Sequence, residues 1–208
     1  MTENAETKIT YATLGGEGME QVHSALEAQI EPVFESFGAE YGMIIGGNEV
    51  LADNKFEDYS PVDDRILLGT FQSGTEEHVG QAVEAARNAL PQWSGLPWQE
   101  RVTCLREVSQ AIRNARWELS VILGYEVGKN RMESVGEVEE CSDFIDYYCD
   151  RMEEHNGFVT SFGDDSEEQS SLSVLRPYGV WSIISPFNFP MALTAGPVGA
   201  ALVTGNTV

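Results

Sequence analysis

Residues 177–208 contain no charged side chain, although the whole 208-residue chain carries a formal net charge of −22. A protein this acidic places its carboxylates in water, so we expect a charge-free tract to lie in the interior. The tract is long enough to span a membrane, which takes about 20 apolar residues. However, Pro186, Pro190 and Pro197 divide it into pieces too short to cross as one helix. The pattern favours a strand, a tight turn and a short helix in an α/β core.

The turn in this tract, residues 185–190, reads Ser-Pro-Phe-Asn-Phe-Pro and follows an expected strand over 179–185. In open parallel sheets, ligands bind beyond the carboxyl ends of strands and near helix N-termini. Asn188 would lie there, and its amide NH₂ can donate to an oxygen that gains negative charge. The alternative is that Asn188 only caps the following helix, as asparagine often does.

Acidic residues dominate the charge balance, with 34 Asp and Glu against 12 Lys and Arg. Such a surface repels nucleic acid phosphates and anionic lipid, so neither is an expected partner. Two explanations remain for the charge: a solubilising surface, or adaptation to a salty cytoplasm where counterions screen the repulsion. Only three of the basic residues are lysines, and the acids are spread along the whole chain, which favours a halophilic protein.

The cysteines and histidines predict neither a disulfide nor a metal site. Cys104, Cys141 and Cys149 have no metal-type spacing. On one helix, Cys141 and Cys149 would lie roughly 12 Å apart along the axis, too far for a disulfide. The three histidines are far apart in sequence. Because the N-terminus lacks the basic and apolar regions of a signal peptide, we expect a cytoplasmic protein with reduced thiols.

Hydrophobic periodicity predicts the order of the elements. After a loose segment over 1–17, we expect helices over 18–37, over 73–90, from 97 to between 124 and 128, and over 132–152. We expect strands over 41–45, 48–51, 65–72, 172–175 and 179–185. Ser73 and Glu76 form an expected capping box for the second helix, and Pro97 opens the third. The acidic residues of the fourth helix are interpreted mostly as its wet face. The acidic tract 163–171 is expected to be a solvated loop.

Residues 126–129, Glu-Val-Gly-Lys, invite comparison with a phosphate-binding loop but do not fit one. Leu123 stands where the first glycine of that motif belongs, and Asn130 stands where a Ser or Thr would hold magnesium. Gly128 is instead expected to form the left-handed end of a helix.

Taken together, these motifs resemble the aldehyde dehydrogenase superfamily. Its members typically show Pro-Trp-Asn-Phe-Pro and later Gly-Asn-Thr-Val, and this chain has Pro-Phe-Asn-Phe-Pro at 186–190 and Gly-Asn-Thr-Val at 205–208. The similarity begins near Tyr41, and upstream features in the family's order are Trp93, a helix containing Arg101, Glu-Val-Gly-Lys at 126–129 and Asp-Phe-x-x-Tyr-Tyr at 143–148. The resemblance implies the N-terminal part of that α/β fold: a Rossmann-like parallel sheet with flanking helices and the start of an oligomerisation hairpin.

The resemblance also implies a division of the chain. Residues 1–40 would form an N-terminal tail and helix, and residues 41–208 part of a cofactor-binding domain. Residues 156–175 would be a loop or oligomerisation excursion from that domain. By the same likeness, the full-length protein would be a homo-oligomer.

Within the superfamily, residues 125–130 and 143–148 look most like the 1-pyrroline-5-carboxylate dehydrogenases, which oxidise L-glutamate γ-semialdehyde to glutamate in proline catabolism. This likeness implies that Asn188 is the oxyanion-hole amide and that Phe189 packs on the aliphatic part of the substrate. Glu140 matches a helix carboxylate near the site that anchors the aldehyde. The partner implied is a small-molecule aldehyde.

The same likeness implies a nicotinamide cofactor, NAD or NADP. Ser185, Pro186 and Phe187 would line its site, the first and last chiefly through their backbone. Phe187 departs from the commoner Trp of the superfamily.

The chain also departs from the family in extent. It stops before the family's Lys-Pro, its cofactor-binding Gly loop, its general-base Glu and its nucleophilic Cys. Without a thiolate to attack the aldehyde no hydride can be transferred, so the chain alone is expected to be inactive. Two alternatives remain open: another semialdehyde or aliphatic aldehyde dehydrogenase, and a non-catalytic acidic assembly or regulatory protein that keeps the fold.

Overall fold

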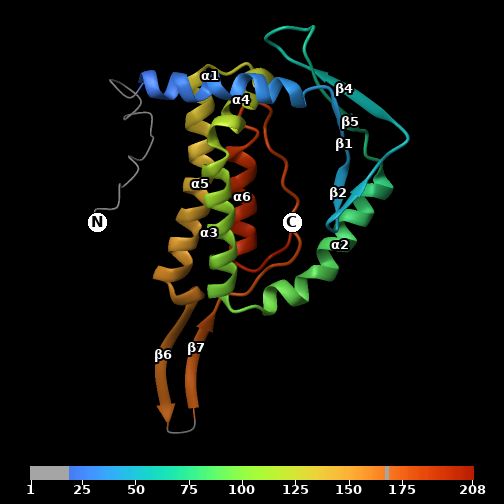
Figure 1. Ribbon diagram of the computed structural model, residues 1–208. Coiled ribbons are helices and arrows are strands. Elements are labelled where there is room, and N and C mark those ends of the chain that lie inside the picture. Colours follow the sequence, from blue (N-terminus) through green and yellow to red (C-terminus); the bar gives the residue numbers. More distant parts are fainter. Residues whose placement is uncertain (1–18, 167–168) are drawn as a thin grey trace.

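The computed structural model describes residues 19–166 and 169–208 and combines a layer of helices with small sheets (Figure 1). The helices are α1 (Met19–Ser36), α2 (Glu76–Gly95), α3 (Trp98–Asn114), α4 (Arg116–Val127), α5 (Arg131–Glu154) and α6 (Ala192–Val203), with the 3-10 helix η1 (Asn156–Phe158). The strands are β1 (Ala39–Tyr41), β2 (Met43–Ile45), β3 (Asn48–Val50), β4 (Lys55–Tyr59), β5 (Leu67–Gln72), β6 (Val159–Ser166) and β7 (Gln169–Val174). Residues 1–17, expected to be loose, lie outside the described part.

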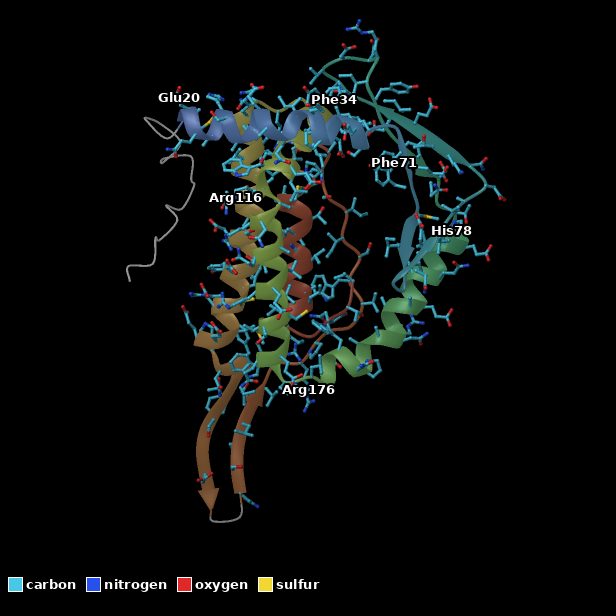
Figure 2. All side chains as sticks on the ribbon, in the orientation of Figure 1. Glu20, Phe34, Phe71, His78, Arg116 and Arg176 are labelled. Carbon is cyan, nitrogen blue, oxygen red and sulfur yellow. The ribbon has the colours of Figure 1, made fainter. Side chains whose placement is uncertain are left out.

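Two hydrophobic clusters hold the helical layer together. One joins α3, α5 and α6, and its buried members are Val102, Leu105, Ile145, Cys149, Met152 and Val203. The other joins α1 to α4 and α5 through Val22, Leu26, Val33, Val121 and Val135. Helix α1 lies across one end of the layer, with Glu20 and Phe34 near its two ends (Figure 2). These contacts fix α6, and with it the turn that precedes α6, against α5.

Helix α6 approaches α5 closely because two of its residues are glycines. A Cβ atom added at Gly196 would lie 3.2 Å from Cδ2 of Phe144, and one at Gly199 would lie 3.1 Å from Cγ1 of Ile145. Both separations are tighter than ordinary van der Waals contact, so larger residues would push the helices apart.

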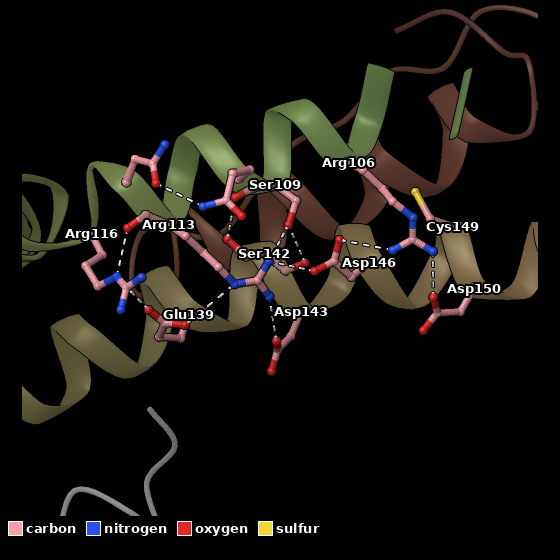
Figure 3. Close-up of polar contacts among 12 residues, drawn as sticks. Arg106, Ser109, Arg113, Arg116, Glu139, Ser142, Asp143, Asp146, Cys149 and Asp150 are labelled. Atoms are coloured by element: carbon pink, nitrogen blue, oxygen red, sulfur yellow. Dashed lines mark hydrogen bonds and ion pairs between the residues drawn. The ribbon is translucent and has the colours of Figure 1, made fainter. Parts of the chain in front are cut away.

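Charged side chains also connect α3 and α4 to α5 (Figure 3). We name this set the arginine ladder: Arg106, Arg113 and Arg116 face Glu139, Asp143, Asp146, Asp150 and Glu153. The N–O distances include 2.6 Å from Arg113 to Asp146 and 2.8 Å from Arg106 to Asp150. The carboxylate of Asp150 raises the pKa of the Arg106 guanidinium above its usual value. Ion pairs therefore join these helices, from the partly exposed pairs of Arg106 to the buried carboxylate of Glu139.

Three sheets accompany the helices. In the first, β5 pairs in parallel with β1 and antiparallel with β4. In the second, β2 and β3 form the expected hairpin around Gly46 and Gly47, whose φ angles of 59° and 80° suit glycine. The third is the antiparallel pair β6–β7. Parallel pairing within residues 19–166 and 169–208 consists of β1–β5 and one bridge between Val180 and Thr207.

The capping box expected at Ser73 and Glu76 is wrong. The cap of helix α2 lies two residues later, at Thr75, because the Ser73 amide donates to the Asn54 carbonyl and so belongs to the preceding sheet. The box is formed by Thr75 and His78 instead. The apolar face expected for this helix is also largely exposed, and no residue of α2 is buried.

The single helix expected from Pro97 to between 124 and 128 is two helices. At Ala115 the backbone departs from helical geometry, with φ −92° and ψ 10°, so α3 ends and α4 begins there. The Arg116 guanidinium donates to the carbonyl oxygen of Arg113 and satisfies an acceptor that the break leaves free. Helix α4 then ends at Gly128, which is left-handed as expected, with φ 76°.

The described residues of the solvated loop expected over 163–171, namely 163–166 and 169–171, instead belong to strands β6 and β7, whose hairpin extends away from the helical layer (Figure 1). The antiparallel pairing of these two strands continues through the acidic tract, where Asp164 lies opposite Ser170. Asp164 is exposed, in keeping with a surface excursion, whereas Glu167 and Glu168 lie outside the described residues.

The expectation that residues 177–208 are interior is only half right. Helix α6 is packed, but the side chains of Ile184 and Phe187 are 92% and 89% exposed. The strand expected over 179–185 is also wrong. A strand needs a neighbour for its ladder, and among the described residues only Thr207 pairs with this segment, at Val180.

Within the described ranges, no helix combines the length and the apolar character needed to cross a membrane.

Candidate active site

The turn over residues 185–190 is closed onto the first turn of α6 by two hydroxyl groups. The Thr194 hydroxyl donates to the carbonyl oxygen of Pro190 at 2.5 Å. Its single proton is then used, so the Ser185 hydroxyl donates to Thr194 Oγ1 at 2.6 Å. These bonds join the two ends of the turn.

The backbone amides at the start of α6 are satisfied by a carboxylate from another helix. Glu137, on α5, is 0% exposed. Its Oε1 accepts hydrogen bonds from the amide nitrogens of Met191 at 2.9 Å and Ala192 at 3.2 Å. The first amides of a helix have no partner within the helix, and the helix N-terminus favours a negative charge. Glu137 therefore caps α6 from outside.

Lys129 completes this arrangement from the connection between α4 and α5. Its ammonium group pairs with Oε2 of Glu137 and lies 3.5 Å from the centre of the Phe189 ring. The ion pair neutralises a carboxylate that would be very costly to bury alone. We name Lys129, Glu137 and the amides of Met191 and Ala192 the α6 anchor. It joins α5, α6 and the turn at one point.

Asn188 is left free by this arrangement. The residue at the cap of α6 is Met191, and the terminal amides donate to Glu137. The alternative in which Asn188 caps the helix is therefore wrong. Asn188 and its neighbours Pro186 and Phe187 are exposed, so their side chains are available to a ligand.

Glu140 lies one helical turn after Glu137, on the same side of α5, and is partly exposed. Among the described residues, no hydrogen bond or ion pair ties it to the turn. Its role near a substrate stays a prediction.

The acidic face of α5 was expected to be mostly wet, and this is wrong for Glu137 and Glu139, both of which are buried. One sequence signal could have identified Glu137. It continues the buried stripe at helical spacing that also contains Ser134, Cys141 and Ile145.

The C-terminal end of α6 and the residues that follow it are held by side chains that carry the motifs noted in the sequence. The Trp93 indole donates to the carbonyl of Leu202 at 2.9 Å, and buried Arg101 donates through Nε to that of Val203 at 3.0 Å. Burial lowers the pKa of Arg101. Asn206 is also buried, and its side-chain oxygen accepts from the Gly179 amide at 2.9 Å. Both ends of the charge-free tract are thereby fixed together.

None of the three cysteines forms a disulfide. Burial raises the pKa of Cys141 to about 12 and that of Cys149 to about 11. Both are thiols at neutral pH and so are poor nucleophiles. Cys104 is exposed on α3.

Comparison with known proteins finds relatives that are similar over most of this chain. The 1-pyrroline-5-carboxylate dehydrogenase 2 of Bacillus subtilis is 31% identical over 185 residues, covering 88% of this chain and 35% of that protein. A crystal structure of 1-pyrroline-5-carboxylate dehydrogenase from Thermus with bound NAD superimposes with a TM-score of 0.85 at 29% identity, covering 100% of this chain and 40% of that one.

A second kind of structure is also similar. NADP-dependent glyceraldehyde-3-phosphate dehydrogenase from Bacillus halodurans, complexed with NADP, has a TM-score of 0.74 at 28% identity, covering 81% of this chain and 36% of that one. The chain therefore spans between 35% and 40% of the length of these three proteins. Its α/β architecture is the N-terminal part of their fold, as expected. The model of the aldehyde dehydrogenase family matches residues 50–208, and the chain belongs to that family of oxidoreductases.

Proposed function

We propose that the protein containing this chain is an NAD(P)-dependent dehydrogenase that oxidises L-glutamate γ-semialdehyde to glutamate, a step of proline catabolism. The observation that carries the proposal is the exposed Asn188, held in a turn whose helix is capped by another residue. The names of the relatives at about 30% identity support the choice of substrate. In this proposal residues 41–208 form part of the cofactor-binding domain, and residues 1–40 an N-terminal tail and helix.

Asn188 is the residue to which we assign chemistry. Its amide donates to the aldehyde oxygen as that oxygen gains negative charge, and a fixed donor of this kind stabilises the transition state more than the substrate. Phe189 packs on the aliphatic part of the substrate. Glu140 lies on the same side of α5 as Glu137, one turn along the helix, and is assigned to the aldehyde anchor.

The surface around Ser185, Pro186 and Phe187 fits a nicotinamide cofactor. The exposed Phe187 ring and Ile184 side chain offer an apolar face to a planar ring, with backbone groups of the turn beside them. NAD or NADP, when bound, accepts the hydride that leaves the aldehyde carbon. The chain's own contribution is to place that ring beside the Asn188 amide.

Formation of the covalent intermediate needs a thiolate, and the cysteines of this chain do not supply one. Cys141 and Cys149 are buried thiols, and Cys104 lies on α3 at a groove formed with α2 and α6. We therefore assign the reaction to the polypeptide translated from the complete reading frame. The 208-residue chain alone is expected to show no turnover.

In the decisive experiment, that complete polypeptide is expressed and purified, and the formation of NADH and NADPH is measured with different aldehydes. We expect the highest kcat/KM with glutamate γ-semialdehyde, supplied as its cyclic form in equilibrium, and lower values with glyceraldehyde 3-phosphate and short aliphatic aldehydes. A preference for another aldehyde would replace the proposed substrate. Absence of turnover with every aldehyde would favour a non-catalytic assembly or regulatory protein.

Self-association is the remaining part of the proposal. The β6–β7 hairpin extends away from the helical layer (Figure 1), and its Phe162 and Leu172 side chains are exposed. Exposed apolar side chains of this kind favour an interface. Replacing both by Ser is expected to convert a homo-oligomer to a smaller species in analytical ultracentrifugation. An unchanged sedimentation coefficient would exclude the hairpin as the interface.

A further inference from the structure

We propose that Lys129 and Glu137 are positioning residues that hold the Asn188 turn in its reactive geometry by fixing the N-terminus of α6. This inference rests on the proposed function, since it assigns a purpose to the geometry of Asn188. Neither residue reaches the reacting atoms in the proposal. Both act through backbone and ring contacts of the turn.

The first support is the way that Glu137 divides its two oxygens. Oε1 accepts from both terminal amides of α6, at 2.9 and 3.2 Å, and Oε2 pairs with Lys129. A carboxylate that accepts from two backbone amides has no freedom to change rotamer without leaving both unpaired in a buried place. Met191 therefore cannot shift unless Glu137 also moves.

The second support is the contact between Lys129 and the turn itself. The Lys129 ammonium lies 3.5 Å from the centre of the Phe189 ring, and Phe189 is the neighbour of Asn188 in sequence. The Lys129 side chain is only 9% exposed, so this cation–π contact is largely shielded from water and stronger than one on the surface. The Asn188 backbone is thus held on its C-terminal side by a ring contact and by the capped helix that follows.

The third support is that folding in general does not require a charge pair at a buried position. An apolar pair of similar volume is often as stable as a buried ion pair. The polar arrangement does more than fill space, because only an acceptor at this position can bind the Met191 and Ala192 amides. Its role is to set where α6 begins, and α6 begins only a few residues after Asn188.

The test uses the complete polypeptide and its kcat with glutamate γ-semialdehyde. Glu137→Ala is expected to lower kcat by about 10- to 100-fold, because a shift of the reacting geometry by about 1 Å has effects of this size. The KM for NAD should change less than about threefold, since the helix cap is not a cofactor ligand in the proposal. The matched control is Glu139→Ala, a buried carboxylate on the same helix that pairs with Arg113 and Arg116. It is expected to keep kcat within about twofold per folded molecule.

A conservative double variant separates the effect of the hydrogen-bond acceptor at position 137 from the effect of the charge pair. The double change Lys129→Met, Glu137→Gln retains an oxygen that accepts from both amides and leaves no unpaired charge. Because the contact of Lys129 with Phe189 is also lost, its kcat should recover most of what Glu137→Ala loses but stay about threefold below the wild type, as in Lys129→Met alone. A double variant as slow as Glu137→Ala would overturn the proposal, because the acceptor would then have been restored without effect.

Hydrogen exchange gives a readout that does not depend on activity. The Met191 and Ala192 amides should exchange at least about tenfold faster in Glu137→Ala than in the wild type, and at the wild-type rate in Glu139→Ala. Equal exchange in Glu137→Ala and wild type would overturn the inference even if kcat fell. Should Glu137→Ala fail to fold, Lys129→Met leaves the amide bonds in place, and a kcat equal to the wild type would then exclude the Phe189 contact as a constraint.

A double-mutant cycle with Asn188→Ala separates this inference from the proposed function. If Glu137 acts by placing Asn188, Glu137→Ala should cost less than about threefold in kcat once Asn188 is gone. If Asn188→Ala alone leaves kcat unchanged, the proposed catalytic role fails, and with it the purpose assigned to the anchor. If Asn188→Ala is slow and Glu137→Ala adds its full effect, only the positioning role fails.

Discussion

The arginine ladder and the α6 anchor are both built from charges on α5, and they differ in burial and in number of partners. In the ladder, Arg106 contacts three carboxylates, and each of the pairs that it forms is partly exposed. In the anchor, one lysine meets one glutamate, and the glutamate is wholly buried. The same helix therefore carries several ion pairs that share partners on one side and a single buried pair on the other.

The difference shows how burial changes what a charged side chain contributes to stability and to local geometry. Exposed pairs are screened by water and ions and contribute little individually, so the ladder serves chiefly to match α5 to α3. A buried carboxylate must have every oxygen satisfied, and this requirement fixes the groups around it. We therefore expect loss of a ladder residue to change stability less than loss of an anchor residue, and only the latter to change the geometry of the turn as well.

The largest expected effect is on stability at the anchor. In urea unfolding of the 208-residue chain, Glu137→Ala should lower the free energy of unfolding by about 3–5 kcal/mol, because it leaves a buried lysine without its counterion. Lys129→Met, Glu137→Gln should cost much less, since no charge is left unpaired. Equal losses in the two variants would show that the pair contributes only packing, and the contrast with the ladder would disappear.

The next effect is on turnover at Asn188. In the complete polypeptide, Asn188→Ala should lower kcat by about 10²- to 10³-fold, the usual loss for one oxyanion donor. Its melting temperature should hardly change, because Glu137 and not Asn188 caps α6. NAD affinity should also stay close to the wild-type value. A variant that melts early but turns over normally would instead show a structural role.

A smaller effect is expected within the ladder. Arg113→Met should lower the free energy of unfolding by about 2 kcal/mol, because one of its partners, Glu139, is buried. Arg106→Met should cost less than about 1 kcal/mol, because its partners are partly exposed. Raising NaCl to about 1 M should reduce the loss of unfolding free energy in Arg106→Met more than the loss in Glu137→Ala. Equal losses of unfolding free energy in Arg106→Met and Arg113→Met would mean that burial of the partner carboxylates does not determine how much each ladder residue contributes.

Salt should also act on the whole chain. With a net charge of −22, repulsion among carboxylates opposes folding, and the screening length falls from about 10 Å at 0.1 M to about 3 Å at 1 M salt. We expect the helical circular dichroism signal to increase over this range. A spectrum that does not change would count against the halophilic interpretation of the composition.

The smallest expected effect is on the rate of cysteine alkylation, with one buried thiol reporting on each of the two regions. Cys149 lies beside the ladder, and Cys141 is on α5 near Glu137. Burial raises both pKa values, to about 11 and about 12, so the thiolate is scarce below those values and alkylation should be slow up to about pH 9. Mass spectrometry should find Cys104 labelled first. Fast labelling of Cys141 at neutral pH would show that the helices around the anchor open easily.

The sequence by itself determined those features whose causes are local. The rhythm of apolar residues gave helices close to the observed α1 and α5, and the two glycines at 46 and 47 marked a hairpin turn. Gly128 was identified as a left-handed helix end for the same reason, since a positive φ is a property of one residue. The order of motifs from Trp93 to the Gly-Asn-Thr-Val segment was enough to indicate the family.

Only the tertiary structure decided which polar groups meet. Glu137 looked like one acid among several on a wet face, yet it caps a helix that begins 55 residues later along the chain, with Ala192 as its farther amide partner. Arg101 binds the Val203 carbonyl across a separation of 102 residues, and nothing near either residue in sequence indicates the other. Helical periodicity and turn chemistry arise from neighbours along the chain, so they are recorded in short stretches of sequence. The partner of a buried charge is set by how distant elements pack, and the packing exists only once the chain has folded.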